Sequence, residues 1–234
     1  MITVRHSEER GHTRVGWLDS WHTFSFDQYY DPEHVNFRAL RVINEDWVAP
    51  GAGFPTHPHR DMEIITYVLE GALQHRDSMG NGSLICPGEV QRMSAGSGIT
   101  HSEYNASKED RVHLLQIWIL PEQKRLEPSY EQKAFSKDKM ENGWLRLAAR
   151  GGGNGAVAVH QDVELYGTRL PEGGRVTYSF RPGGYGWLQV GDGSAQIGDI
   201  PLRTGDGAAI SGEDSITLAG TSGTPAEVLV FDLA

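Results

Sequence analysis

The sequence is poor in cysteine, in basic side chains and in long apolar runs. Its 234 residues include a single cysteine, Cys86, so the chain can form no internal disulfide and no cysteine-rich zinc site. Lys and Arg number 21 against 31 Asp and Glu, which gives a net charge of −10. Because this charge repels phosphate, we expect no direct nucleic-acid partner. No apolar run reaches about 18 residues, so we expect no membrane span.

An export signal is also missing from the sequence. Residues 1–10 are polar and charged, whereas a secretory signal peptide carries an apolar central region. A lone cysteine is typical of proteins in a reducing compartment. We therefore expect a cytoplasmic protein.

Long helices are not expected, because glycine is dense in the second half of the chain. Of the 29 glycines, 18 lie at or beyond Gly151, and each glycine inside a helix costs about 1 kcal/mol relative to alanine. Runs of β-branched, aliphatic and aromatic residues recur between turn signals, at residues 63–69, 113–120, 175–180, 187–190, 215–218 and 227–231. This pattern predicts an all-β fold built as sandwiches or barrels.

The chain reads as two β-rich halves joined by a connection. Residues 121–155 are charged, are interrupted by prolines and end in a glycine-rich stretch, with a short helix expected near residues 131–140. Residues 67–71 resemble 188–193, and residues 87–96 resemble 204–212, which indicates a duplication with a period of about 120 residues. We expect an N-terminal domain over residues 1–120, a connection over 121–155 and a C-terminal domain over 156–234.

Two short polar motifs in the first half have the spacing of metal ligands. They are His57-Pro58-His59 and His101-Ser102-Glu103. Residues i and i+2 of a strand face the same side, about 6–7 Å apart, so each motif directs both of its outer side chains to one place. A lone histidine on a strand is usually a surface or hydrogen-bonded residue, but two such pairs on neighbouring strands predict a metal site. Three imidazoles and one carboxylate suit Fe, Mn, Co, Ni, Cu or Zn.

These motifs are similar to those of the cupins. The stretch from Gly51 through His57 and His59 to Gly71 resembles the first cupin motif. The stretch from Gly88 through His101 to Asn105 resembles the second. In most cupins the carboxylate ligand comes from the first motif, which would make Glu63 the ligand.

A more specific resemblance is to the pirin family. It covers about residues 5–135, and more loosely the remainder, through residues 16–26, 40–46, 57–64, 66–71 and 93–105. Pirins are bicupins, with two tandem double-stranded β-helix (jelly-roll) barrels. The resemblance implies that His57, His59, His101 and Glu103 hold the metal, and it selects Glu103 over Glu63. We expect one divalent metal per chain, with Fe(II) first and Ni, Co, Mn, Cu or Zn as alternatives.

The resemblance also implies a reaction. Bacterial pirin-like proteins are associated with flavonol 2,3-dioxygenase (quercetinase) activity, in which O₂ opens the central ring of the flavonol and carbon monoxide is released. Glu103 would then be the catalytic base, since it is the one base in the constellation. The expected partners are a small aromatic substrate and O₂.

Two other functions stay open from the sequence. One is a non-enzymatic, metal-binding redox sensor that acts through a protein partner, as the iron-dependent co-regulator among eukaryotic pirins implies. The other is a different cupin reaction, on a small organic acid or a sugar. The walls of the site distinguish these substrates, because a flavonol needs a wide apolar slot and a small acid needs Arg or Lys. The direction of Arg60 and Arg92 is undetermined at this stage.

The second half offers no equivalent ligands. Aligning Gly71 with Gly193 places Ser179 and Arg181 at the positions of His57 and His59, and no histidine follows His160. We therefore expect a single metal site. We interpret the remaining candidates as structural: His75 and His113 as strand-face histidines, Cys86 as an inert thiol, and His22 as part of an aromatic segment (residues 21–30) used for packing, with contact to a flat substrate as the alternative.

Overall fold

A computed structural model describes residues 1–221 and 223–234 of the chain. The described residues form short strands and two 3₁₀ helices, which confirms the predicted all-β class. They group into two compact units. The N-terminal unit comprises Gly11–Ala134 and Val157–Gln161, and the C-terminal unit comprises Met1–Arg10, Phe135–Ala156 and Asp162–Ala234. Within the described residues, no helix has the length and apolarity to cross a bilayer.

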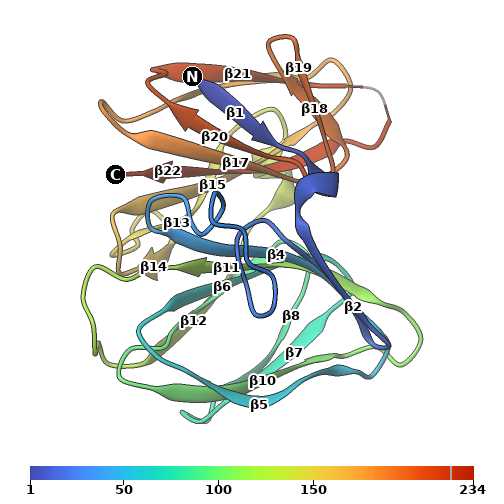
Figure 1. Cartoon of the computed structure of the whole chain (residues 1–234), viewed down its shortest axis with the longest axis vertical. Coiled ribbons are helices and arrows are strands. Elements are labelled where there is room, and N and C mark those ends of the chain that lie inside the picture. The colour runs from blue at the N-terminus through green and yellow to red at the C-terminus, as the bar shows by residue number, and fades with distance from the viewer. Residues whose placement is uncertain (222) are drawn as a thin grey trace. The chain divides into compact units, whose positions relative to one another are not determined.

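The N-terminal unit is a barrel of two antiparallel sheets (Figure 1). The larger sheet has the order β12 (Ser129–Ala134), β9 (Glu89–Ser94), β6 (Glu63–Glu70), β11 (Val112–Ile119), β4 (Leu40–Val48), β3 (Leu18–His22) and β2 (Gly11–Val15). The smaller sheet has the order β5 (Gly53–His59), β10 (Ile99–Asn105), β7 (Leu73–Asp77) and β8 (Gly82–Ile85). Side chains that point inward from both sheets form the interior.

Two apolar clusters fill much of this barrel. One consists of Val48, Val68, Leu73, Ile85, Val112 and Leu114, and the other of Ile64, Met93, Ala95 and Ile99. Complete burial of each large side chain contributes about 1.5–3 kcal/mol. The inner face of the larger sheet also carries a row of polar residues that are direct neighbours across strands, in the order Thr66, Gln116, Asn44 and His22.

The helix expected near residues 131–140 is wrong for most of that stretch. Residues up to Ala134 continue strand β12, and a 3₁₀ helix, η2 (Lys137–Met140), is the helical part. Alternation explains the strand: Tyr130 and Gln132 share one face, where the Tyr130 hydroxyl donates to Gln132 Oε1 at 2.7 Å, whereas Glu131 contacts Arg92. Pairing with β9 outweighs the weak helix preference of a short charged segment.

The C-terminal unit is a second antiparallel barrel. One sheet contains, in order, β1 (Ile2–Arg5), β20 (Gly207–Ser211), β17 (Tyr185–Asp192), β22 (Ala226–Leu233), β15 (Val163–Leu170) and β13 (Leu145–Arg150). The other has the order β16 (Arg175–Ser179), β21 (Ser215–Gly220), β18 (Ser194–Ile197) and β19 (Ile200–Arg203). A 3₁₀ helix, η1 (Ser7–Glu9), follows β1.

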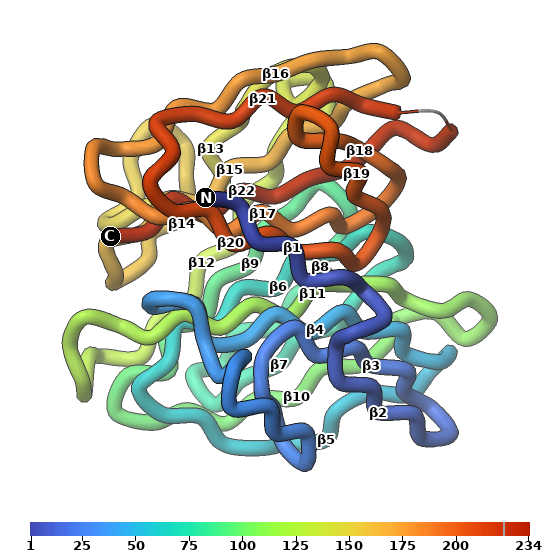
Figure 2. Tube along the Cα trace, turned by 45° about the horizontal axis from the view of Figure 1, so that its top comes forward, coloured from blue at the N-terminus to red at the C-terminus, as the bar shows by residue number. Residues whose placement is uncertain are grey.

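Each unit includes a segment that is remote from it in the sequence. Strand β1 pairs with β20 in the C-terminal unit, and Figure 2 shows its tube running beside β20. The amino group of Met1 donates to the Ser211 carbonyl at 2.6 Å. Strand β14 (Val157–Val159) and the residues up to Gln161 belong to the N-terminal unit.

A large apolar cluster fills the interior of the C-terminal barrel. Strand pairing places Tyr178 opposite Ile216, as His57 lies opposite His101, so Tyr178 and Phe180 take the places of His57 and His59. The expected equivalence with Ser179 and Arg181 is therefore wrong by one residue. The reason is that four residues separate Phe180 from the start of β17, whereas three separate His59 from the start of β6. Ile216 and Leu218 occupy the places of His101 and Glu103. Metal-ligating clusters among the described residues lie in the N-terminal unit.

Candidate metal centre

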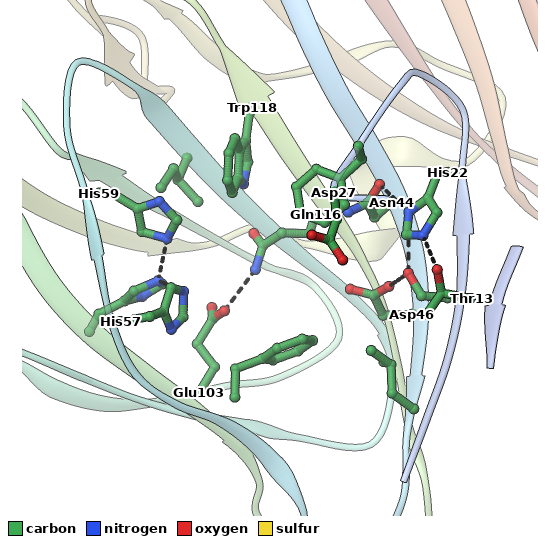
Figure 3. Close-up of a pocket in the computed structure, with 16 residues that line it drawn as sticks. Thr13, His22, Asp27, Asn44, Asp46, His57, His59, Glu103, Gln116 and Trp118 are labelled. Carbon is green, nitrogen blue, oxygen red and sulfur yellow. Dashed lines mark hydrogen bonds between the residues drawn. The ribbon is translucent and has the colours of Figure 1, made fainter. Parts of the chain in front are cut away.

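Three imidazoles converge where β5 pairs with β10 in the N-terminal barrel (Figure 3). His57 lies directly opposite His101, and His59 lies two residues along on the same face. His101 Nε2 is 3.0 Å from His57 Nε2 and 3.0 Å from His59 Nε2. Three ring nitrogens that face one another this closely form a group that can hold a metal ion.

The local structure of β5 fixes the orientation of His57. The strand carries one extra residue relative to β10 between Phe54 and His57, which makes a bulge at Pro55 and Thr56. The carbonyl of Pro55 accepts a hydrogen bond from His57 Nδ1 at 2.8 Å. Since Nδ1 carries the proton, the lone pair of a neutral His57 lies on Nε2 and points to the other two rings.

A glycine allows β5 to approach β10. A Cβ atom on Gly53 would lie 2.1 Å from the backbone oxygen of Glu103, a distance that no side chain tolerates. The neighbouring residue, Phe54, reaches the same cavity as the histidines. The sequence of β5 therefore serves close packing at one end and ligand placement at the other.

Burial keeps the imidazoles of His59 and His101 uncharged. It lowers the pKa of His59 to about 4 and that of His101 to about 3, and neighbouring imidazoles lower both pKa values further. The rings are therefore neutral near pH 7, which is the form that binds metals. His101 Nδ1 is buried without a hydrogen-bond partner among the described residues.

Glu103 lies beside the three histidines, on the same face of β10 as His101 (Figure 3). Its carboxylate is 3% exposed and accepts hydrogen bonds from Gln116 Nε2 at 2.9 Å and from Thr66 Oγ1 at 3.3 Å. It forms a second possible ligand group with His75 and His101, whose donor atoms lie within 4.8 Å of one another. The tight group of three imidazoles does not include it.

The three imidazoles and Glu103 border a cavity of about 180 Å³ in the N-terminal unit. Its side walls are apolar and aromatic, formed by Leu18, Phe26, Phe54, Ile64 and Trp118. The Trp118 ring meets the His59 ring edge to face, with centroids 4.9 Å apart. The lining residues, all within the described part of the chain, include no Lys and no Arg.

The end of the cavity away from His57 and His59 is polar (Figure 3), and the sequence analysis missed most of its residues. It is formed by Thr13, Ser20, His22, Asn44 and Asp46, and the exposed Asp27 also lines the cavity. Ser20 Oγ donates to Asp46 Oδ1 at 2.5 Å. Burial raises the pKa of Asp46 to about 7, and the carboxylates of Glu103 and Glu45 add to this effect.

One signal in the sequence marks this polar end. Asn44-Glu45-Asp46 is a polar run between apolar residues of β4, which is unusual for a central strand. By alternation, Asn44 and Asp46 face the cavity, whereas Glu45 accepts a hydrogen bond from His113 Nε2 at 3.0 Å. His22 and Phe26 also line the cavity, so the aromatic segment contributes to its wall.

Other candidate residues are engaged elsewhere. Glu63 is 1% exposed and accepts hydrogen bonds from Ser94 Oγ at 2.9 Å and from the His160 backbone at 3.2 Å. His75 contacts Asp77 at 3.3 Å, in full burial. None of these residues lines the cavity.

The two arginines left open by the sequence also lie outside the cavity lining. Arg92 is buried and donates to Ser94, Ser129 and Glu131, whereas Arg60 is exposed. The free thiol of Cys86 is half-buried.

Two barrels of this topology, one of which holds a histidine cluster between its sheets, define a bicupin. Residues 3–119 match the family described as Pirin, and residues 146–233 match the quercetinase C-terminal cupin domain. The chain belongs to the pirin family, as its motifs predict.

Individual relatives span the whole chain. A protein of Escherichia coli K12 named quercetin 2,3-dioxygenase is 48% identical over 233 residues, which cover 100% of this chain and 99% of the relative. A pirin-like protein of Caulobacter vibrioides is 40% identical over 235 residues, which cover 100% of this chain and 100% of the relative. Among solved structures, the bacterial pirin YhhW from E. coli in complex with nickel(II) has a TM-score of 0.93 at 47% identity, with 100% of this chain and 99% of that chain covered.

Proposed function

We propose that this protein is a metal-dependent dioxygenase that opens the central ring of flavonols such as quercetin with O₂. The observation that carries the proposal is the cavity itself, in which three imidazoles and a carboxylate border an apolar slot without Lys or Arg. The relatives named quercetin 2,3-dioxygenase support the same substrate class.

The metal would be held by His57, His59, His101 and Glu103. The fit rests on the donor set. His57 turns its Nε2 to the centre, His101 Nε2 lies 3.0 Å from the Nε2 atoms of both His57 and His59, and the donor atoms of the three rings lie within 4.8 Å of one another. We propose Fe(II) as the ion used with O₂, and the same donors suit the nickel(II) that YhhW binds. When bound, such an ion supplies Lewis acidity toward the substrate hydroxyl and redox chemistry with O₂.

Glu103 would act as the base. Its oxygens already accept hydrogen bonds from Gln116 and Thr66, which hold the carboxylate in place at the edge of the slot. A flavonol placed with its 3-hydroxyl against Glu103 would pass the hydroxyl proton to the carboxylate, and Glu103 would return the proton to the opened product.

The cavity walls favour a flat aromatic substrate over a small acid. Phe54, Ile64 and Trp118 offer apolar surface for stacking and exclude water. A small organic acid would bring its own negative charge next to Glu103 and Asp46, and no Lys or Arg in the cavity lining would pair with it. The lining therefore supports the flavonol over the acid.

The test is flavonol loss with and without the histidine cluster. The protein is loaded with Fe(II) without air and mixed with quercetin, and absorbance is followed as O₂ is admitted. We expect O₂-dependent decay for the wild type and none for His101→Ala, which should also lose its metal. Absence of decay in a wild type with confirmed bound iron would overturn the proposal.

A further inference from the structure

Asp46 is a buried carboxyl group that the proposed reaction does not use. Its side chain is 3% exposed and is turned toward the middle of the cavity (Figure 3). Among the described residues, Ser20 is the one hydrogen-bond donor to its side chain, at 2.5 Å. A buried carboxylate ordinarily accepts several hydrogen bonds, so Asp46 retains capacity to accept one from an occupant of the cavity.

The polar side chains next to Asp46 are already bonded to one another. His22 Nδ1 donates to Asn44 Oδ1 at 2.9 Å, and the Thr13 hydroxyl donates to His22 Nε2 at 2.9 Å. This chain fixes the His22 ring and leaves Asp46 as the strong acceptor at this end of the cavity. Above pH 7, where Asp46 is ionised, its carboxylate accepts and never donates, so it selects a ligand that brings a donor.

The position of Glu103 determines which part of a flavonol would reach Asp46. Figure 3 places Glu103 between the histidine cluster and Asp46. In a flavonol the pendant phenyl ring is attached to the carbon next to the one that bears the 3-hydroxyl, on the side away from the 4-carbonyl. The pendant ring therefore extends along Phe54 toward Asp46, and the fused ring extends the other way.

We propose that Asp46, oriented by Ser20, is a subsite that accepts a hydrogen bond from a hydroxyl on the pendant ring of the flavonol. The preferred substrates are then flavonols with a free hydroxyl on this ring. Flavonols that carry sulfate or another anionic group there are rejected by charge. This subsite rests on the proposed function, because it takes the orientation of the substrate from Glu103.

The test measures binding without turnover. Nickel-loaded protein is titrated under nitrogen with three flavonols. All three have the same fused ring system with its 3-hydroxyl and 4-carbonyl, and they carry two, one or no hydroxyls on the pendant ring. Binding is followed by quenching of tryptophan fluorescence, for which Trp118 lies in the cavity wall. We expect the hydroxylated flavonols to bind the wild type about tenfold more tightly than the unsubstituted one, and Asp46→Asn to reduce this ratio to about two.

A matched control removes the same charge away from the cavity. Asp199 is exposed, lies in the turn between β18 and β19 and does not line the cavity, so Asp199→Asn should keep the wild-type ratio of dissociation constants. Equal binding of the three flavonols by the wild type would overturn the subsite and leave the proposed function standing. An unchanged ratio in Asp46→Asn would also overturn it. Failure of the wild type to bind any of the three would overturn the proposed function as well.

Discussion

Glu103 is the residue whose two proposed roles can be separated by one substitution. Glu103→Gln removes the base but keeps the shape of the side chain and an oxygen that can still accept from Gln116. We expect the variant to keep much of its metal, held by three imidazoles, and to lose at least about a hundredfold in flavonol turnover, because proton transfer by a positioned group contributes about 10²–10⁴-fold. Metal content by atomic absorption and O₂ consumption provide the two measurements. Turnover at the wild-type rate would show that Glu103 is not the base.

Asp46 should make the stability of the metal-free protein depend on pH. Its pKa is raised from the ordinary value of 3.8 to about 7 by burial, so the folded protein keeps this proton at pH values where the unfolded chain has lost it. The stabilising contribution is complete below about pH 4 and is lost as the pH rises through about 7, at up to ~1.4 kcal/mol per pH unit.

The substitution Asp46→Asn isolates this contribution. The variant lacks the titration and can still accept from Ser20, so its unfolding free energy should rise relative to wild type between about pH 4 and 7, by a few kcal/mol in all. Urea denaturation of both metal-free proteins across this range measures the difference. A difference that does not change with pH would contradict the expectation.

Residue by residue, the sequence predicts the proposed metal ligands more directly than the walls of the cavity. His57, His59, His101 and Glu103 follow from parity on two strands, because spacing along one strand decides which side chains share a face. Asp46, Ser20 and Trp118 come from three strands whose order across the sheet is set by long-range pairing. No spacing within the chain reveals that these residues face one cavity.

Among the elements, β5 combines a bulge, a proline and a close approach to β10. Gly53→Ala would place a methyl group 2.1 Å from the Glu103 backbone oxygen, so β5 and β10 would have to separate. We expect a loss of about 1–3 kcal/mol in unfolding free energy and a weaker affinity for metal, since His57 and His101 lie on these two strands. Thermal unfolding and metal titration of the variant test this.

Gly16→Ala is the matched control for this substitution. An added Cβ at Gly16 meets no atom within 4 Å, so the same chemical change should leave stability and metal affinity near those of the wild type. If Gly53→Ala behaved in the same way as this control, the close approach of β5 to β10 would not matter for the site.

Strand existence is predicted more reliably than strand register. The apolar runs at residues 63–69 and 113–120 correspond to β6 and β11. The equivalence of β16 with β5 fails by one residue because it depends on the length of a turn, which apolar patterning does not determine. Likewise, β12 is polar and is a strand because it pairs with β9.

At the scale of the whole molecule, strand β1 belongs to the unit formed mainly by the C-terminal half. Its backbone pairs with β20, and the Met1 amino group contacts the Glu213 carboxylate at 2.5 Å. Deletion of residues 1–10 should leave β20 with an unpaired edge and lower the stability of the C-terminal unit, while all proposed metal ligands remain. Hydrogen exchange of the β20 amides, together with a metal titration, tests both parts. Unchanged protection in β20 would contradict the expected role of β1.

This pairing also has a consequence for biosynthesis. Strand β1 leaves the ribosome before its partner β20, which follows roughly 200 residues later, and at about 5–20 residues per second this is a wait of about 10–40 s. The segment Val157–Gln161 likewise reaches the N-terminal unit only after translation has passed its strands. Neither barrel is complete while it is being made in sequence order, so a nascent chain interrupted before β20 carries β1 without its partner strand, available to chaperones or to another nascent chain.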